Sequence, residues 1–166
     1  MKLQISREEM PVGSLFAITL SQTGFAYGLI SAFGPLCFVT DIFQLWTDEL
    51  ILEPFENSFP EILIESLPIS GKEFSQGWKI ISYISNYTRS YPPTLIFGVP
   101  PIQRVITLDG RTPKRPATRS EIETLRHLRI NSPNVNTAEV QDTLIRRGIK
   151  KLHSPRKSTE EEGQKR

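Results

Sequence analysis

The side chains best suited to catalysis or metal binding are few and far apart in this sequence. The chain has two histidines, His127 and His153, and one cysteine, Cys37, which lies in an apolar run. A zinc site needs several such ligands converging on one point, so we expect no bound metal. A lone cysteine permits no intramolecular disulfide bond, and Cys37 is expected to be a small buried hydrophobe.

Pairs of carboxylates are the other candidates for chemistry. Glu61 with Glu65, or Glu49 with Glu53, could place a general acid beside a general base. The same spacing fits exposed acidic surface far better. Motifs of serine hydrolases, phosphate-binding glycine loops and zinc proteases do not occur in the sequence. We therefore expect neither an enzyme nor a cofactor.

The elements that would position a site begin with an uncharged stretch, residues 10–40. A membrane-spanning helix needs about 20 consecutive apolar residues, but a polar turn at 21–24 and a Gly-Pro pair at 34–35 interrupt this one. The remaining pieces alternate apolar side chains with the period of two that strands show, over 15–20, 25–33 and 36–43. Because such short turns join antiparallel neighbours, the stretch predicts a β-meander.

The middle of the chain alternates strand patterns with breaks. Residues 44–60 read as a long loop with one short strand near 50–52. Two proline pairs, at 92–93 and 100–101, indicate strand ends or sheet edges. Further strands are expected at 61–67, 78–84, 94–97 and 103–108.

Helical signals occur only in the last third of the sequence. Thr118 followed by Glu121 forms a capping box, the signature of a helix start. A second helix is expected from about Thr137, with Val140, Leu144 and Ile145 facing inward. Gly148 ends it as a left-handed cap. Residues after Ile149 have almost nothing to bury.

These patterns predict an α+β protein with an antiparallel, strongly bent β-sheet, formed around the N-terminal meander, and two C-terminal helices. Residues 1–149 are expected to form one domain, and 150–166 a disordered, charged tail. The absence of disulfide chemistry and of a signal-peptide pattern favours the cytoplasm and no membrane partner. Prolines at sheet edges favour a monomer.

Charge is unevenly distributed along the chain. Residues 1–99 carry a net charge of −5, 100–149 carry +4 and 150–166 carry +3, which agrees with the formal net charge of +2. The basic part could follow a phosphate backbone, so nucleic-acid binding is the alternative function. Against it, the aromatic residues lie mostly in the acidic part, and no nucleic-acid motif occurs. A small-ligand barrel is a third possibility.

Segment 44–60 combines aromatic and acidic side chains, the composition of a protein-binding surface. We expect Trp46 and Phe55 to be apolar anchors, with the acids presenting negative potential to a basic cleft. For Trp46, core packing is favoured over an interface role, and Tyr27 and Trp78 are assigned to the core. The candidate partner-binding residues are Trp46, Asp48, Glu49, Glu53, Phe55 and Glu56.

Five short segments carry a resemblance to a known family. They are GSLFAITL at 13–20, GFAYGLI at 24–30, FVTDI at 38–42, GWKII at 77–81 and RPATRSE at 115–121. In this order they resemble immunity protein family twenty-six of bacterial polymorphic toxin systems, over residues 11–130. The sequence departs from the family at Ser14, where an acidic residue is common, and at Thr19, where proline is common.

The resemblance implies a small cytoplasmic α+β protein, encoded beside a toxin, that binds the toxin domain and blocks it without catalysis. Its expected partner is a cognate protein toxin domain, and a nuclease with a basic cleft would suit the acidic segment. The assignment of segment 44–60 to that contact comes from its composition, since the family does not assign these residues.

Overall fold

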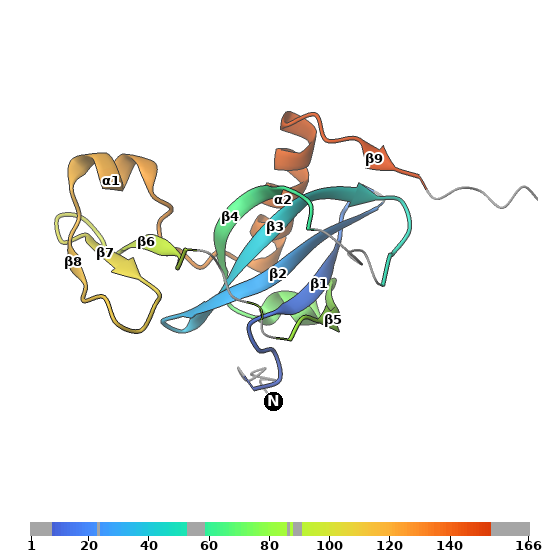
Figure 1. The fold of residues 1–166 in the computed structure, drawn as a ribbon. Helices are drawn as coiled ribbons and strands as arrows, with labels where there is room; N and C mark the ends of the chain where they lie inside the picture. Colours follow the sequence, from blue (N-terminus) through green and yellow to red (C-terminus); the bar gives the residue numbers. More distant parts are fainter. Residues whose placement is uncertain (1–7, 23, 53–58, 86, 88–90, 154–166) are drawn as a thin grey trace, which may run out of the picture.

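The computed structural model describes residues 8–22, 24–52, 59–85, 87 and 91–153. The predicted N-terminal meander is present. Its strands are β1 (Ser14–Thr19), β2 (Phe25–Gly34) and β3 (Cys37–Thr47). β1 pairs antiparallel with β2, and β2 with β3, with register shifts that mark irregularities in the β2–β3 pairing. Such bulges bend and twist strands, as the curved ribbons show (Figure 1).

Two further strands complete the main sheet. β4 (Ile62–Ile69) pairs with β3, and β5 (Trp78–Tyr83) pairs with β1, giving the order β4-β3-β2-β1-β5 within the described residues. Pro68 lies in β4, at the edge of this order, where a missing amide hydrogen is tolerated. The short 3-10 helix η1 (Lys72–Ser75) connects the two strands. The antiparallel α+β class predicted from the sequence is confirmed.

The main core lies between one face of this sheet and helix α2 (Pro133–Arg146). Phe16, Ile18 and Ile42 from the strands pack in the same cluster as Val140 and Leu144 of the helix, all almost fully buried. A second cluster on the other face surrounds Leu15, Leu29 and Phe43. Both faces of the meander are therefore buried, which explains why its sequence carries no charge until Asp41.

The assignments of Tyr27 and Trp78 to the core are confirmed, because they are 0% and 2% exposed. The Tyr27 hydroxyl lies 2.8 Å from Thr47 Oγ1 and accepts a hydrogen bond from the amide of Ile51 at 2.9 Å. A buried tyrosine hydroxyl needs such partners. Tyr27 thus ties the start of the loop after β3 to the sheet. Cys37, 4% exposed, is buried as expected.

A second, smaller sheet lies beside the first (Figure 1). Its antiparallel strands are β6 (Thr94–Phe97), β7 (Arg104–Thr107) and β8 (Arg115–Pro116). Leu95 and Ile106 of this sheet pack in one cluster with Ala32 and Val39 of the β2–β3 hairpin. The predicted strand patterns at 94–97 and 103–108 are correct, but the sequence did not separate them from the main sheet.

Both predicted helices are present with different bounds. α1 (Arg119–Thr124) begins at Thr118, whose hydroxyl accepts from the Glu121 amide while the Glu121 carboxylate accepts from the Thr118 amide. The predicted capping box is therefore confirmed. α2 begins at Pro133 with Ser132 as its N-cap, earlier than expected. Among the described residues, no helix is long and apolar enough to cross a membrane.

The end of α2 follows the prediction at Val140 and Leu144, which are fully buried, and at Gly148, whose φ of 68° lies in the left-handed region. The expectation that Ile145 faces inward is wrong, because its side chain is 49% exposed. Ile145 lies about 100° around the helix axis from Leu144 and farther still from Val140, outside the arc of buried residues.

The strands in the region expected to be loop and tail differ from the prediction, and residues 50–52, expected to form a short strand, do not form one. β3 continues to Thr47, so Gln44–Thr47 belongs to the sheet and not to a loop. Lys151 and Leu152, placed in the tail by the sequence, form β9 and pair in parallel with Trp46 and Thr47. This parallel pair is local and interrupts the otherwise antiparallel pattern. Residues 154–166 lie outside the described part.

The capping box of α1 gives a prediction about pH. The Arg115 guanidinium, which bonds the Glu121 carboxylate at 2.9 Å, together with the Thr118 amide, lowers the pKa of Glu121 from 4.5 to about 2. Because the folded-state pKa is depressed, the contribution of this group is present above the unfolded value and is lost as pH falls from 4.5 toward 2. A side-chain carboxyl NMR titration should therefore show a midpoint near 2 for Glu121.

The variant Arg115→Ala should move the Glu121 midpoint upward, toward the usual glutamate range. A wild-type Glu121 midpoint near 4.5 would contradict the bond between Arg115 and Glu121.

Candidate functional site

The predicted aromatic anchor Trp46 lies at the end of β3, half-buried against the main core. β9 pairs with β3 at Trp46, and Lys151 Nζ lies 4.9 Å from the centroid of the Trp46 ring. The Trp46 indole nitrogen is buried and has no hydrogen-bond partner among the described residues. Trp46 therefore packs as a core residue on one side, with a cation over its ring.

The acids predicted beside Trp46 lie in different surroundings. Asp48 Oδ2 lies 3.0 Å from His153 Nδ1, and the amide of Asp48 donates to the carbonyl of Leu152. Glu49 is exposed, and its backbone carbonyl accepts from Thr47 Oγ1 at 2.7 Å. The three other candidates, Glu53, Phe55 and Glu56, lie outside the described residues.

Several exposed apolar side chains surround the same end of β3. They are Ile51, Leu52, Phe59, Ile62 and Leu152, exposed by between 37% and 56%. Phe59 stacks on Phe43 with ring centroids 5.8 Å apart. Glu61, which is exposed, is fixed to the strand because its carbonyl accepts from the Gln44 amide at 2.8 Å. We call these five residues with Asp48, Glu49 and Glu61 the β3-end surface.

The β3-end surface contains residues that the sequence assigned to other elements. Glu61 and Ile62 were assigned to the next strand, and Leu152 with His153 to the tail. β3 and β4 are antiparallel and β9 returns to β3, so three separate segments meet here. Only the long-range pairing brings Leu152 and Asp48 together, and no local pattern could show it.

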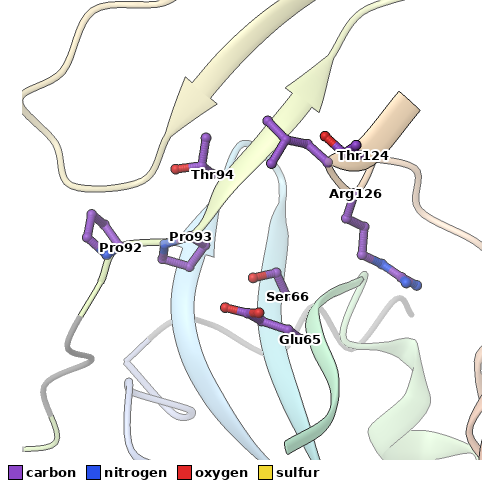
Figure 2. A pocket seen from close by; sticks show the side chains of 8 residues that line it. Glu65, Ser66, Pro92, Pro93, Thr94, Thr124 and Arg126 are labelled. Atoms are coloured by element: carbon purple, nitrogen blue, oxygen red, sulfur yellow. The ribbon is translucent and has the colours of Figure 1, made fainter. Parts of the chain in front are cut away.

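A shallow basic groove lies at a different place, between β4, α2 and the segment that links α1 to α2. Three adjoining hollows of about 350, 370 and 390 Å³ share Leu125 and Arg126. Figure 2 shows one of them, with Glu65 and Ser66 of β4 on one side and Thr124 and Arg126 on the other. Arg126 forms an ion pair with Glu139 of α2 at 2.7 Å.

The cations of this groove differ in pairing. Arg129, Arg146 and Arg147 also line it and form no ion pair with any residue in the described ranges. Unpaired arginines can bind carboxylates or phosphates in bidentate geometry. His127, the one histidine near the groove, lies 2.8 Å from the carbonyl of Ile122 through its Nε2.

A metal site would need three or more ligands close together in the described part of the chain. There, no three side chains of histidine, cysteine, aspartate or glutamate gather closely enough to hold a metal ion. The arrangement that the structure does present is a mixed apolar and acidic surface at one end of a sheet and a basic groove beside α2.

By fold and by these surfaces the chain is a small α+β protein with a bent antiparallel sheet, a candidate protein-binding surface and a candidate anion-binding groove. The chain matches no protein-family model, no curated protein sequence and no solved structure.

Proposed function

We propose that this chain is an immunity protein that binds a cognate toxin domain and neutralises it without catalysis. The observation that carries the proposal is the β3-end surface, where exposed apolar side chains stand beside the exposed acids Glu49 and Glu61. An apolar surface with acidic side chains around it is suited to a protein partner whose binding surface is basic. The five segments that resemble immunity family twenty-six support the same conclusion.

The surface also indicates how the partner would be recognised. Asp48 already contacts His153, and Lys151 lies over Trp46. Glu49 and Glu61 form no ion pair within the residues described, so they are the acids available to a basic cleft. Long-range attraction of this kind mainly increases the association rate and is screened by salt. The apolar residues would then determine how slowly the complex dissociates.

The direct experiment is co-purification of this protein with the toxin domain that the proposal expects a neighbouring gene to encode. Stable complex formation, together with loss of toxicity in cells that express both chains, is the expected result. A toxin domain that neither binds this protein nor is neutralised by it would contradict the proposal.

Charge reversal tests the assigned surface. The double variant Glu49→Lys/Glu61→Lys should associate with the toxin domain about tenfold more slowly at low salt, and the defect should shrink at high salt. The control Glu123→Lys/Asp142→Lys changes the net charge equally but alters exposed acids of α1 and α2. Stopped-flow association rates at two salt concentrations measure both. Equal slowing by the two variants would remove the β3-end surface from the contact.

Nucleic-acid binding is the second candidate, and the unpaired arginines of the basic groove are the observation that favours it. Phosphate contacts of Arg129, Arg146 and Arg147 would give affinity for arbitrary DNA or RNA that falls steeply with salt. A gel-shift titration with both nucleic acids distinguishes this function from the first. Binding that Arg146→Gln/Arg147→Gln abolishes would support it, whereas indifference to both nucleic acids would exclude it.

A further inference from the structure

The hairpin that joins β6 to β7 ends in an exposed apolar tip, residues 97–102, which we call the hairpin tip. Its sequence is Phe-Gly-Val-Pro-Pro-Ile, and no side chain in it can form a hydrogen bond. Val99 and Ile102 are 76% and 68% exposed, and Phe97 is 37% exposed. Large apolar side chains that gather on a surface usually mark an interaction site.

The backbone of the hairpin tip is also poor in free donors. Pro100 and Pro101 have no amide hydrogen. The amide of Ile102 donates to the carbonyl of Val99 at 2.9 Å, which closes the turn. Burial of unpaired amide groups in an apolar medium is costly. Two prolines without an amide hydrogen and one paired amide lower the cost of placing the tip in an apolar environment.

Two cations lie at the base of the hairpin tip. Arg104 is the partner of Phe97 in the β6–β7 register, and Lys114 Nζ lies 4.7 Å from the centroid of the Phe97 ring. Neither side chain forms an ion pair in the part of the chain described here. Arg115, by contrast, is neutralised by Glu121. The tip thus carries positive charge directly behind its apolar residues.

We propose that the hairpin tip inserts into the surface of an anionic lipid bilayer, with Arg104 and Lys114 against the lipid headgroups. Apolar residues in the acyl boundary combined with cations at headgroup level are the two signals that reversible membrane attachment uses. A protein partner would require about one hydrogen bond per 100–200 Å² of interface, which these six side chains cannot supply. The occupant that fits best is therefore lipid.

This proposal does not depend on the proposed immunity function, because the hairpin tip and the β3-end surface are built from different elements. It departs from the expectation of no membrane partner. That expectation followed from the interrupted apolar stretch at 10–40, whereas attachment through an exposed tip needs no spanning segment.

The test is co-sedimentation of the purified protein with vesicles of phosphatidylcholine containing phosphatidylglycerol. The wild type should bind, and Val99→Asp/Ile102→Asp should bind at least tenfold more weakly. Leu36→Asp is the control for the single variant Val99→Asp, which adds the same one negative charge, since Leu36 is 91% exposed at the turn between β2 and β3. It makes the same kind of apolar-to-acid change outside the hairpin tip and should bind as the wild type does.

The cations are tested separately. Arg104→Glu/Lys114→Glu should lose the preference for phosphatidylglycerol over pure phosphatidylcholine vesicles, and high salt should have the same effect on the wild type. Thermal unfolding of every variant verifies that the fold is retained. Failure of the wild type to sediment with anionic vesicles would overturn the proposal, as would equal loss of binding in Leu36→Asp. Unchanged vesicle binding by Val99→Asp/Ile102→Asp, with loss of toxin-domain capture, would make the tip a protein interface instead.

Discussion

Trp78→Ala should lower the free energy of unfolding by about 4 kcal/mol, among the largest effects expected for one substitution in this protein. Trp78 is 2% exposed and stacks on Phe16 with ring centroids 5.2 Å apart. It also meets Phe74 edge to face at 6.2 Å. Its indole nitrogen donates to Thr137 Oγ1 of α2 at 2.9 Å. The substitution removes the packing and the tie between β5 and α2 together.

Urea denaturation measures the loss in the free energy of unfolding. Two further variants show how much of it comes from the hydrogen bond and how it compares with the loss at the other tryptophan. Trp78→Phe keeps most of the ring packing and loses the bond to Thr137, at a cost of about 1–2 kcal/mol. Trp46→Ala removes the other tryptophan, which is only half-buried, and should cost about 2 kcal/mol. If Trp46→Ala destabilised the protein as much as Trp78→Ala, Trp46 would be as central to the core as Trp78.

The contrast between the two tryptophans shows what the sequence could predict. Trp78 follows Gly77 in a strand pattern and was correctly assigned to the core. The prediction of the meander was also correct. Polar turns and period-two alternation are local signals, and strands joined by short turns pair with their neighbours in sequence. Where neighbours in sequence are neighbours in space, pattern and structure agree.

Contacts between distant segments could not be predicted in the same way. Leu152 and Lys151 are only two residues of strand, too few to show a period, and their partners in β3 lie about a hundred residues earlier. The same limit applies to the β3-end surface, where Glu61 and Leu152 join the predicted Asp48 and Glu49. The composition of 44–60 gave candidate residues for a binding surface, but only the pairing of β3 with β4 and β9 shows which side chains lie near them.

Glu73 is the clearest case of a residue that the sequence could not place. It lies in a polar segment between Gly71 and Gly77, which reads as a solvated connection. In the structure its side chain is fully buried. Its carboxyl accepts from the Gly71 amide and from Asn136 Nδ2 of α2, each at 2.9 Å. Asn136 is 63 positions away, so no local signal indicates the pair.

Asn136→Ala should therefore destabilise the protein by about 3 kcal/mol, because the buried carboxyl of Glu73 loses a donor that water cannot easily replace. Ser70 Oγ donates to the other carboxyl oxygen, Oε2, at 3.4 Å, and so does not replace the bond from Asn136 to Oε1. The control Asn134→Ala makes the same change two residues earlier on α2, at an exposed position, and should stay within about 0.5 kcal/mol of the wild type.

A double-mutant cycle separates the bond from the general loss of packing. In the background Glu73→Ala, the substitution Asn136→Ala should cost clearly less than in the wild type, with a coupling of about 1–3 kcal/mol. Equilibrium unfolding in urea supplies all four free energies. Strictly additive costs would mean that the two side chains stabilise η1 and α2 independently. The hydrogen bond between them would then contribute nothing, and the buried carboxyl would depend on the Gly71 amide and the Ser70 hydroxyl.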